Sequence, residues 1–345
     1  MKEAIVRKDT SVDIVDSSIP KPGPGHVLIK VIVAGSNPKD WKLPIILGPD
    51  MNTGDDIAGT VEAVGEDVVG FNKGDRVAAF HEMRTSNGAF AEYAIAPYYT
   101  TFHIPDSTTF EEAATIPLAA YTSVCALFQE LELPEPWSPL SKAAGKEGTK
   151  RPLIIYGAST ATGAFAIKLA AAANIHPIIT VGSKRSEFIK PFLDESKGDV
   201  LVDYTAYGTE EELIKAIQEA VRKGDDTVRL VTKVIAGPPD AAGRRPKVTN
   251  IFLKTEVEGS DPSVDIVFSM VGQVHYEDEN DKLIGVTWGA AFSRGLREGW
   301  LTSHPYTVGK NGLEGLSEGL KGLKDGKIRA QKFLMRPSET PGASN

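Results

Sequence analysis

The feature that most constrains the fold is a regular alternation of apolar strands and helical segments that begins at residue 153. The segment LIIYGASTATGAFAIKLA (153–170) runs from a buried strand through a turn of small residues into a helix. Further strands are predicted at 176–183 and 199–204, and helices at 185–196 and 209–223. Strands and helices in this order form a parallel, doubly wound sheet. We therefore predict an α/β domain with this topology.

The first hundred residues follow a different pattern, with short strands separated by turns rich in Gly and Pro. Strand composition is found at 26–35, 57–65, 75–80 and 89–97. Many short strands with such turns are typical of a small barrel or sandwich. A chain of 345 residues also exceeds the usual size of a single core. Two domains are therefore expected.

Between these regions the sequence changes to helical spacing. Thr108 and Glu111 have the spacing of a capping box, and the helical pattern that follows is expected to break at Pro117. Residues 134–152 are polar and rich in Pro, Gly and Lys, which indicates a surface loop. Later in the chain, strands are predicted at 251–257, 264–272 and 329–336, and a helix at 312–326.

Charge and cysteine content exclude several classes of function. The net charge of −8 argues against a nucleic-acid or anionic-membrane partner. No apolar run approaches the roughly 20 residues of a membrane span, and residues 1–15 do not resemble a signal peptide. The single cysteine, Cys125, fits a reducing compartment and is expected to be buried and inert. We therefore predict a cytoplasmic protein whose chemistry uses no metal.

The turn at 157–163 lies between a strand and a helix, where doubly wound folds bind phosphate groups. A helix N-terminus offers unpaired N–H groups and a partial positive charge, and small residues let a phosphate approach the backbone. The candidate binding residues are Gly157, Ser159, Thr160, Ala161, Thr162 and Gly163. A strand–helix connection without a ligand is the alternative reading of this turn.

The end of the second strand indicates which dinucleotide is bound. Sites for NAD carry an acidic residue there, whereas sites for NADP carry a cation. This chain has Ser183, Lys184 and Arg185 at that point, which suits a 2′-phosphate. The alternative is a solvated helix start. The turn at 157–163 and the end of the second strand together predict an NADPH site.

Several motifs, in this order along nearly the whole chain, resemble the medium-chain dehydrogenase/reductase superfamily and its zinc-free quinone-oxidoreductase branch. They are NPKDWK (37–42), GDDIAGTVEAVG (54–65), FNKGDRVAAF (71–80), GAFAEYAI (88–95) and EEAATIPLAAYTS (111–123). More narrowly, YGASTATG (156–163), FSRGLREGW (292–300) and HPY (304–306) resemble the trans-acting enoyl reductases of fungal polyketide synthases. They also resemble fungal proteins often labelled zinc-binding oxidoreductases.

The resemblance implies a GroES-like β-barrel domain formed by residues 1–123 and 286–345, and a Rossmann domain at 124–285, with the active site in the cleft between them. The typical reaction is NADPH-dependent reduction of a carbon–carbon double bond conjugated to a carbonyl. The substrate would be a small molecule, free or carrier-bound. Zinc-binding relatives place Cys and His where this chain reads AGSNPKD (34–40). Monomer and homodimer both occur among such relatives and both stay open.

The resemblance also implies roles for single residues. Lys42 matches a lysine near the nicotinamide and would act as electrophile or proton source; a surface lysine is the alternative. Asn37 and Asp40 would line the nicotinamide pocket, with Asn37 also plausible as a turn residue. Thr122 would reach the nicotinamide, although a helix hydroxyl bonded to a carbonyl is an alternative. Tyr204 would pack on the adenosine side of NADPH.

Five other residues receive weaker interpretations. Tyr121 has the chemistry of a proton donor but stands where a core aromatic is expected. His304 and Tyr306 would edge the cleft. Asp55 and Asp56 are expected to be solvated in a turn.

One region departs from the family pattern. The fourth Rossmann strand is expected soon after Tyr204, but 227–235 lacks its small-residue end and 264–272 comes about 60 residues later. Either an insertion displaces the strand, or part of the sheet is missing. A non-catalytic NADPH-binding scaffold or sensor is therefore an alternative to an enoyl reductase, as is a quinone reductase. A secondary-alcohol dehydrogenase is disfavoured, because zinc ligands and a Tyr-x-x-x-Lys pair are missing.

Overall fold

The computed structural model describes residues 1–48, 50–139, 141, 152–221, 235–239, 243, 245–251, 259–275 and 278–344. Contacts divide the chain into two compact units. Unit 1 comprises Met1–Tyr121 and Gly272–Asn345, and unit 2 comprises Thr122–Val271. The domain boundaries predicted from the sequence, 123/124 and 285/286, lie two and 14 residues after these divisions.

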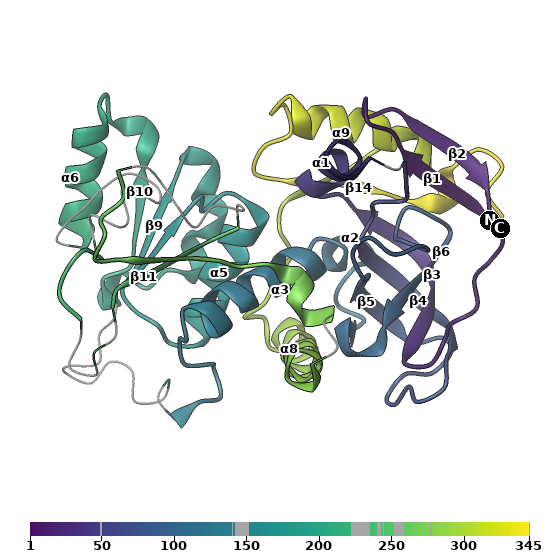
Figure 1. Cartoon of the computed structure of the whole chain (residues 1–345), viewed down its shortest axis with the longest axis horizontal. Helices are drawn as coiled ribbons and strands as arrows, with labels where there is room; N and C mark the ends of the chain where they lie inside the picture. Colours follow the sequence, from purple (N-terminus) through teal and green to yellow (C-terminus); the bar gives the residue numbers. More distant parts are fainter. Residues whose placement is uncertain are drawn as a thin grey trace. The chain divides into compact units, whose positions relative to one another are not determined.

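Unit 1 is built on a mixed sheet whose strands follow the order β13-β14-β3-β4-β5-β7, with β6 paired to β3 (Figure 1). The strands are β3 (His26–Gly35), β4 (Asp56–Val64), β5 (Arg76–Phe80), β6 (Tyr93–Pro97), β7 (Thr101–His103), β13 (Tyr306–Val308) and β14 (Lys332–Met335). A separate antiparallel pair joins β1 (Lys2–Val6) to β2 (Val12–Asp16). The four strands predicted in the first hundred residues are all present, so the β-rich character of this region is confirmed.

The C-terminal strand completes this sheet. Leu334 and Met335 of β14 pair with Gly35 and Ala34 at the end of β3. Apolar side chains from segments far apart in sequence meet in one core; Ile29 of β3, Phe90 and Leu320 of α9 are fully buried in the same cluster. Burial of each such side chain stabilises the fold by about 1.5–3 kcal/mol. Both ends of the chain therefore contribute to one core.

Two glycines allow α8 (Glu279–Glu298) to pack closely within unit 1. A Cβ on Gly285 would lie 2.6 Å from the Tyr99 carbonyl oxygen, and one on Gly289 would lie 3.1 Å from the Tyr121 hydroxyl. That hydroxyl donates to the Gly285 carbonyl oxygen at 3.0 Å. Tyr121 is fully buried and its ring lies 5.1 Å from that of Phe292. Its position is therefore that of a core aromatic.

The predicted capping box lies one residue later than expected. Thr109, not Thr108, caps α2 (Phe110–Ala113): its hydroxyl accepts from Glu112 N at 3.1 Å, and Glu112 Oε2 accepts from Thr109 N at 2.8 Å. Glu111 instead accepts from Arg336 Nε at 2.9 Å. The break at Pro117 is confirmed, because α3 (Pro117–Val124) starts there and continues into a π-helix (Cys125–Glu130).

Two short helices of unit 1 come directly before or after strands of its sheet along the chain. They are α1 (Pro38–Leu47), which follows β3, and α9 (Leu316–Lys324), which precedes β14 and pairs with α1. No helix among the described residues combines the length and the apolarity that crossing a membrane requires.

Unit 2 contains a parallel three-stranded sheet in the order β10-β9-β8. The strands are β8 (Leu153–Tyr156), β9 (Ile178–Gly182) and β10 (Val200–Asp203), and the helices α5 (Ala161–Ala172) and α6 (Glu210–Val221) follow β8 and β10. Residues Lys184–Phe192 form a 3-10 helix, not the α-helix expected at 185–196. Pro191 inside this segment supplies no N–H for a longer helix. The doubly wound order of strands and helices is otherwise as predicted.

The fourth strand of this sheet is not found in the described part of unit 2. The predicted strand 264–272 forms β12 (Asp265–Phe268), which pairs in parallel with β11 (Lys247–Asn250). Within the described ranges, β8 has β9 as its strand partner. The segment 227–234, most of 251–257 and most of the predicted loop at 134–152 lie outside those ranges.

Lys168 is an unusual charge in the interior of unit 2. Its side chain lies on α5 and is 1% exposed, with its ammonium group 4.9 Å from the Phe165 ring centroid and 5.1 Å from that of Phe192. Burial lowers its pKa from 10.5 to about 7. The two aromatic faces offset part of the cost of burying the cation.

Replacing Lys168 by Met should therefore stabilise the protein below pH 7, by about 1–3 kcal/mol. In the wild type, the unfolded chain holds this proton between about pH 7 and 10.5 while the folded chain has released it, so stability should rise with pH across that window. Lys168→Met should lack this rise. Urea unfolding at pH 6, 8 and 10 measures it, with the exposed Lys215→Met as control. Equal pH slopes in all three proteins would contradict the prediction.

Candidate functional site

The turn between β8 and α5 has a backbone that only glycine adopts without strain. Gly157 has φ of 86°, in the left-handed region. At Gly163 a Cβ would lie 2.3 Å from the Gly157 carbonyl oxygen. The helix can therefore start this close to the strand only with glycine at 163. The first N–H groups of α5 are left at the mouth of the turn.

Four hydrogen bonds fix the turn in place. Thr160 Oγ1 accepts from Gly163 N at 3.0 Å and donates to the Gly157 carbonyl oxygen at 2.8 Å. Ser123 Oγ donates to the Thr162 carbonyl oxygen at 2.8 Å. On the β9 side, the Val181 carbonyl oxygen accepts from Gly157 N. Thr160 thus acts as a helix cap with its hydroxyl already engaged, and Ser123 is a supporting residue that sequence reasoning missed.

This geometry fits a pyrophosphate group. We call the turn formed by Gly157–Gly163 the phosphate cradle. Larger side chains at Gly157 and Gly163 would fill it, whereas Ser159, Ala161 and Thr162 are small and half-buried. Anions bind at such helix N-termini through backbone N–H groups and the helix dipole. The turn residues Gly157–Gly163 can accordingly hold the phosphates of a dinucleotide.

The end of β9 presents the predicted cations to solvent. Ser183 caps the 3-10 helix by accepting from Arg185 N at 3.3 Å, and Lys184 and Arg185 are both exposed. Asp203, at the end of the neighbouring β10, was not singled out from the sequence. The Thr205 hydroxyl, which donates to it at 2.6 Å, lowers the pKa of Asp203, and the charge of Lys184 contributes to the same shift.

Two tyrosines stand together at the ends of β8 and β10. Tyr204 and Tyr156 are 43% and 40% exposed, and their rings stack with centroids 6.5 Å apart and planes 16° apart. An exposed aromatic pair provides a flat surface on which a planar base can pack. Tyr156 ends the apolar strand LIIY, and its exposure could not be read from that pattern.

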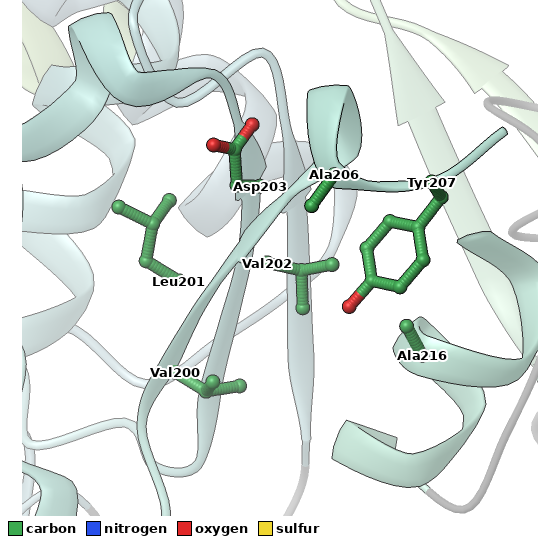
Figure 2. A pocket seen from close by; sticks show the side chains of 7 residues that line it. All are labelled: Val200, Leu201, Val202, Asp203, Ala206, Tyr207 and Ala216. Carbon is green, nitrogen blue, oxygen red and sulfur yellow. The ribbon is translucent and has the colours of Figure 1, made fainter. Parts of the chain in front are cut away.

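A cavity of about 490 Å³ lies along β10, and it does not coincide with the phosphate turn. It is lined by Val200, Leu201, Val202, Asp203, Ala206, Tyr207 and Ala216. Figure 2 shows Tyr207 and Ala216 on one side of the strand and Leu201 on the other. Asp203 lines this cavity and also lies near Lys184 of the predicted cofactor site.

In unit 1, residues from the NPKD and GDD motifs form a buried polar network, and in its first half Asn37 and Asp56 meet Lys332. Asn37 Nδ2 donates to Asp56 Oδ2 at 2.7 Å, and Lys332 Nζ donates to Asn37 Oδ1 at 3.1 Å. Lys332 also forms an ion pair with Asp56, and Leu118 N donates to Asp56 Oδ1 at 2.7 Å. The amide of Asn37 is thus held on both sides by protein groups.

The second half of the network surrounds Lys39. Its ammonium lies 2.9 Å from Asp40 Oδ1 and 2.5 Å from Asp55 Oδ2, and it donates to the Thr53 carbonyl oxygen. Asp40 Oδ2 accepts from Asn37 N at 2.6 Å, which connects the two halves at the start of α1. The side chains of Asp40 and Asp55 are 0% and 2% exposed, and that of Lys39 is 16% exposed.

The expectation that Asp55 and Asp56 are solvated was wrong. Both are buried, because the start of β4 lies between β3 and β5 and the two carboxylates pair with Lys39 and Lys332. Burial raises the pKa of Asp40 to about 7 and that of Asp55 to about 6, although Lys39 opposes both shifts. Burial alone would lower the pKa of Lys39, but the two carboxylates raise it.

Comparison with known proteins places this geometry in a family. Residues 23–106 match the alcohol dehydrogenase GroES-like domain family. The chain is 40% identical over 313 residues to trans-enoyl reductase fsr4 of Gibberella fujikuroi, covering 89% of this chain and 90% of that protein. It is 31% identical over 347 residues to trans-enoyl reductase resD of Aspergillus sclerotiorum, covering 93% and 95%. The chain belongs to the trans-enoyl reductase family.

The fold of this reductase agrees with solved structures of the medium-chain dehydrogenase/reductase superfamily. An alcohol dehydrogenase superfamily protein from Novosphingobium aromaticivorans superposes with a TM-score of 0.74 at 16% identity, over 97% of this chain and 99% of that one. The predicted fold class, a GroES-like domain followed by a Rossmann-type domain, is thereby confirmed, and the protein is an oxidoreductase.

The remaining candidates of the reductase lie in varied surroundings. Lys42 is half-buried on α1, with its ammonium 5.4 Å from the centroid of the Trp41 ring. Thr122 is buried at the end of α3 in unit 2. His304 is 1% exposed, and its backbone N–H donates to Thr115 Oγ1 at 3.0 Å. Tyr306, on β13, is 37% exposed. The expectation that Cys125 is buried is confirmed.

The described residues of the reductase contain no group of three or more His, Cys, Asp or Glu side chains arranged to hold a metal ion. The two buried carboxylates Asp40 and Asp55 are paired with Lys39.

Gly163→Ala tests the cradle of the reductase. A Cβ cannot sit 2.3 Å from the Gly157 carbonyl oxygen, so the turn must shift, at a cost of about 1–3 kcal/mol. The moved N–H groups should also weaken NADPH binding at least tenfold, as measured by fluorescence titration. Ala172→Gly, at the far end of α5, is the matched control and should leave NADPH affinity unchanged. Unchanged affinity in Gly163→Ala would show that the turn does not hold the cofactor.

Proposed function

We propose that this protein is an NADPH-dependent enoyl reductase that reduces a carbon–carbon double bond conjugated to a carbonyl. The observation that carries the proposal is the 40% identity to a trans-enoyl reductase over about nine tenths of both chains. The phosphate cradle in unit 2 and the buried charged network in unit 1 support it, since the reaction needs both a dinucleotide and a source of charge or protons.

The cofactor would be held by residues of unit 2. Gly157–Gly163 would bind the pyrophosphate, with Ser159, Ala161 and Thr162 at the first turn of α5. Tyr204, stacked on Tyr156, would carry the adenosine side. When bound, a reduced nicotinamide supplies a hydride to the β-carbon of the substrate.

Preference for NADPH over NADH would come from Ser183, Lys184 and Arg185. Two exposed cations and a hydroxyl can pair with a 2′-phosphate, which NADH lacks. Asp203 is engaged with Thr205 and lies near Lys184, so it does not cancel both cations.

In unit 1, the proposed roles concern the charge that develops on the substrate carbonyl. Lys42 would stabilise that oxygen as an electrophile, and Asn37 and Asp40 would shape the pocket from the start of α1. Thr122, in unit 2, would contact the nicotinamide. The chemistry would proceed without zinc, since the buried carboxylates Asp40 and Asp55 are both ion-paired with Lys39. The substrate would be a small enoyl compound, free or carrier-bound, and the enzyme a monomer or homodimer.

A non-catalytic NADPH-binding protein is the second candidate. It is favoured by the pairing of β12 with β11, which leaves no fourth strand beside β8 within the described ranges. This strand position supports the nicotinamide half of a doubly wound site. Such a protein would bind NADPH but reduce none of the α,β-unsaturated thioesters, ketones and quinones of an assay panel.

Titration of NADPH against NADH tests the cofactor assignment. Wild type should bind NADPH at least tenfold more tightly, and Lys184→Ala/Arg185→Ala should lose most of this preference, since the two cations pair with the 2′-phosphate. Lys190→Ala is the matched control, because Lys190 is an exposed lysine of the same 3-10 helix that pairs with Glu187. Equal affinities for both cofactors in the wild type would refute the assignment.

A further inference from the structure

The cluster of Lys39, Asp40 and Asp55 costs more than a surface ion pair. Charges lose hydration when buried, and a buried ion pair often stabilises a fold no better than apolar residues of similar size. Buried titratable groups with a charge partner are candidates for a functional site. The cluster also contains more carboxylates than ammonium groups, which is not the composition of a simple structural pair.

Several atoms in this cluster remain available for proton exchange. Among the described residues, Asp40 Oδ1 and Asp55 Oδ2 are buried and meet the Lys39 ammonium without a well-aligned hydrogen bond. The Thr53 hydroxyl is buried beside them and has no hydrogen-bond partner in the described ranges. Lys39 is the member with a partly exposed side chain, at 16%. A proton that leaves the cluster would therefore leave through Lys39.

Resting on the proposed function, we propose that Lys39, Asp40 and Asp55 form the proton relay of the reductase, in which Lys39 Nζ protonates the substrate. A bound reduced nicotinamide would supply hydride to the β-carbon, and the electron pair of the double bond would move onto the carbonyl oxygen as an enolate. The α-carbon then takes a proton from Lys39 Nζ, and Lys39 takes one back from the Asp40–Asp55 pair. Solvent finally restores that proton to the pair through Lys39, the partly exposed member of the cluster. Lys42 keeps the role of electrophile.

The charges around the relay favour a stored proton near neutral pH. Burial raises the pKa of Asp40 to about 7, and the charge of Asp55 adds to the rise. Asp56 raises the pKa of Asp55 in the same way and is itself paired with Lys332. His81, which follows β5, has its pKa lowered chiefly by burial, with a contribution from the charge of Lys39.

The labelling pattern of the product tests the relay. Crotonyl-N-acetylcysteamine thioester is reduced with NADPH in D2O, the product acyl group is coupled to a chiral auxiliary, and NMR of the resulting diastereomers shows on which face of the α-carbon deuterium arrives. Wild type should label one face. Lys39→Met should lower kcat about 10²- to 10⁴-fold and label both faces, because solvent then protonates the enolate. Lys42→Met should be slow but label one face, and the exposed Lys73→Met should match wild type.

Two conservative variants separate proton transfer from structure. Lys39→Arg keeps the charge but does not release a proton, so the relay predicts labelling of both faces, whereas a structural role predicts rescue. Asp55→Asn removes the charge that raises the pKa of Asp40, so the pH above which kcat falls should move lower. NADPH affinity and cooperative unfolding report whether each variant is folded.

The outcomes distinguish the two proposals. If wild type reduces none of the thioesters, ketones and quinones, the proposed function fails and the relay falls with it. If wild type is active but Lys39→Arg and Asp55→Asn keep its single labelled face and its pH profile, the relay alone is overturned, even where Lys39→Met does not fold. Labelling of both faces by folded Lys39→Arg, with NADPH affinity intact, supports the relay.

Discussion

Unit 1 depends on the hydrogen bonds and the ion pair of one buried carboxylate, that of Asp56. It stands at the first residue of β4 and pairs with Lys332, 276 residues away, at the first residue of β14. The same carboxylate accepts from Asn37 before α1 and from Leu118 in the first turn of α3. One buried charge thus fixes the starts of four elements. Removing one partner of such a pair costs about 3–5 kcal/mol, because the other charge stays buried.

What could be predicted from the sequence was mostly local. The turn of unit 2 depends on Gly157, Thr160 and Gly163, which lie within seven residues of one another, so its motif carries its geometry. The strand at 26–35 and the break at Pro117 likewise follow from neighbouring residues. Asp55 and Asp56 could not be placed, because their partners Lys39 and Lys332 approach only after the sheet has formed.

Competition between nearly equal patterns explains the other errors. Thr108 with Glu111 and Thr109 with Glu112 have the same spacing, and the second pair forms the cap because Arg336 from the far end of the chain engages Glu111. The strand 264–272 has the composition of an inner parallel strand, but composition does not name its neighbour, which is β11. In both cases a long-range contact decided between local alternatives.

Lys39 and Lys42 lie about one helical turn apart on α1, but their side chains have different surroundings. They are three residues apart on α1, yet Lys39 lies against two buried carboxylates while Lys42 lies over the Trp41 ring. A lysine paired with carboxylates can exchange a proton with them without creating new net charge in the interior, where such charge is costly. In the proposed mechanism, α1 would supply a proton from Lys39 and a positive charge from Lys42, the two contributions that protonation and stabilisation of an enolate require.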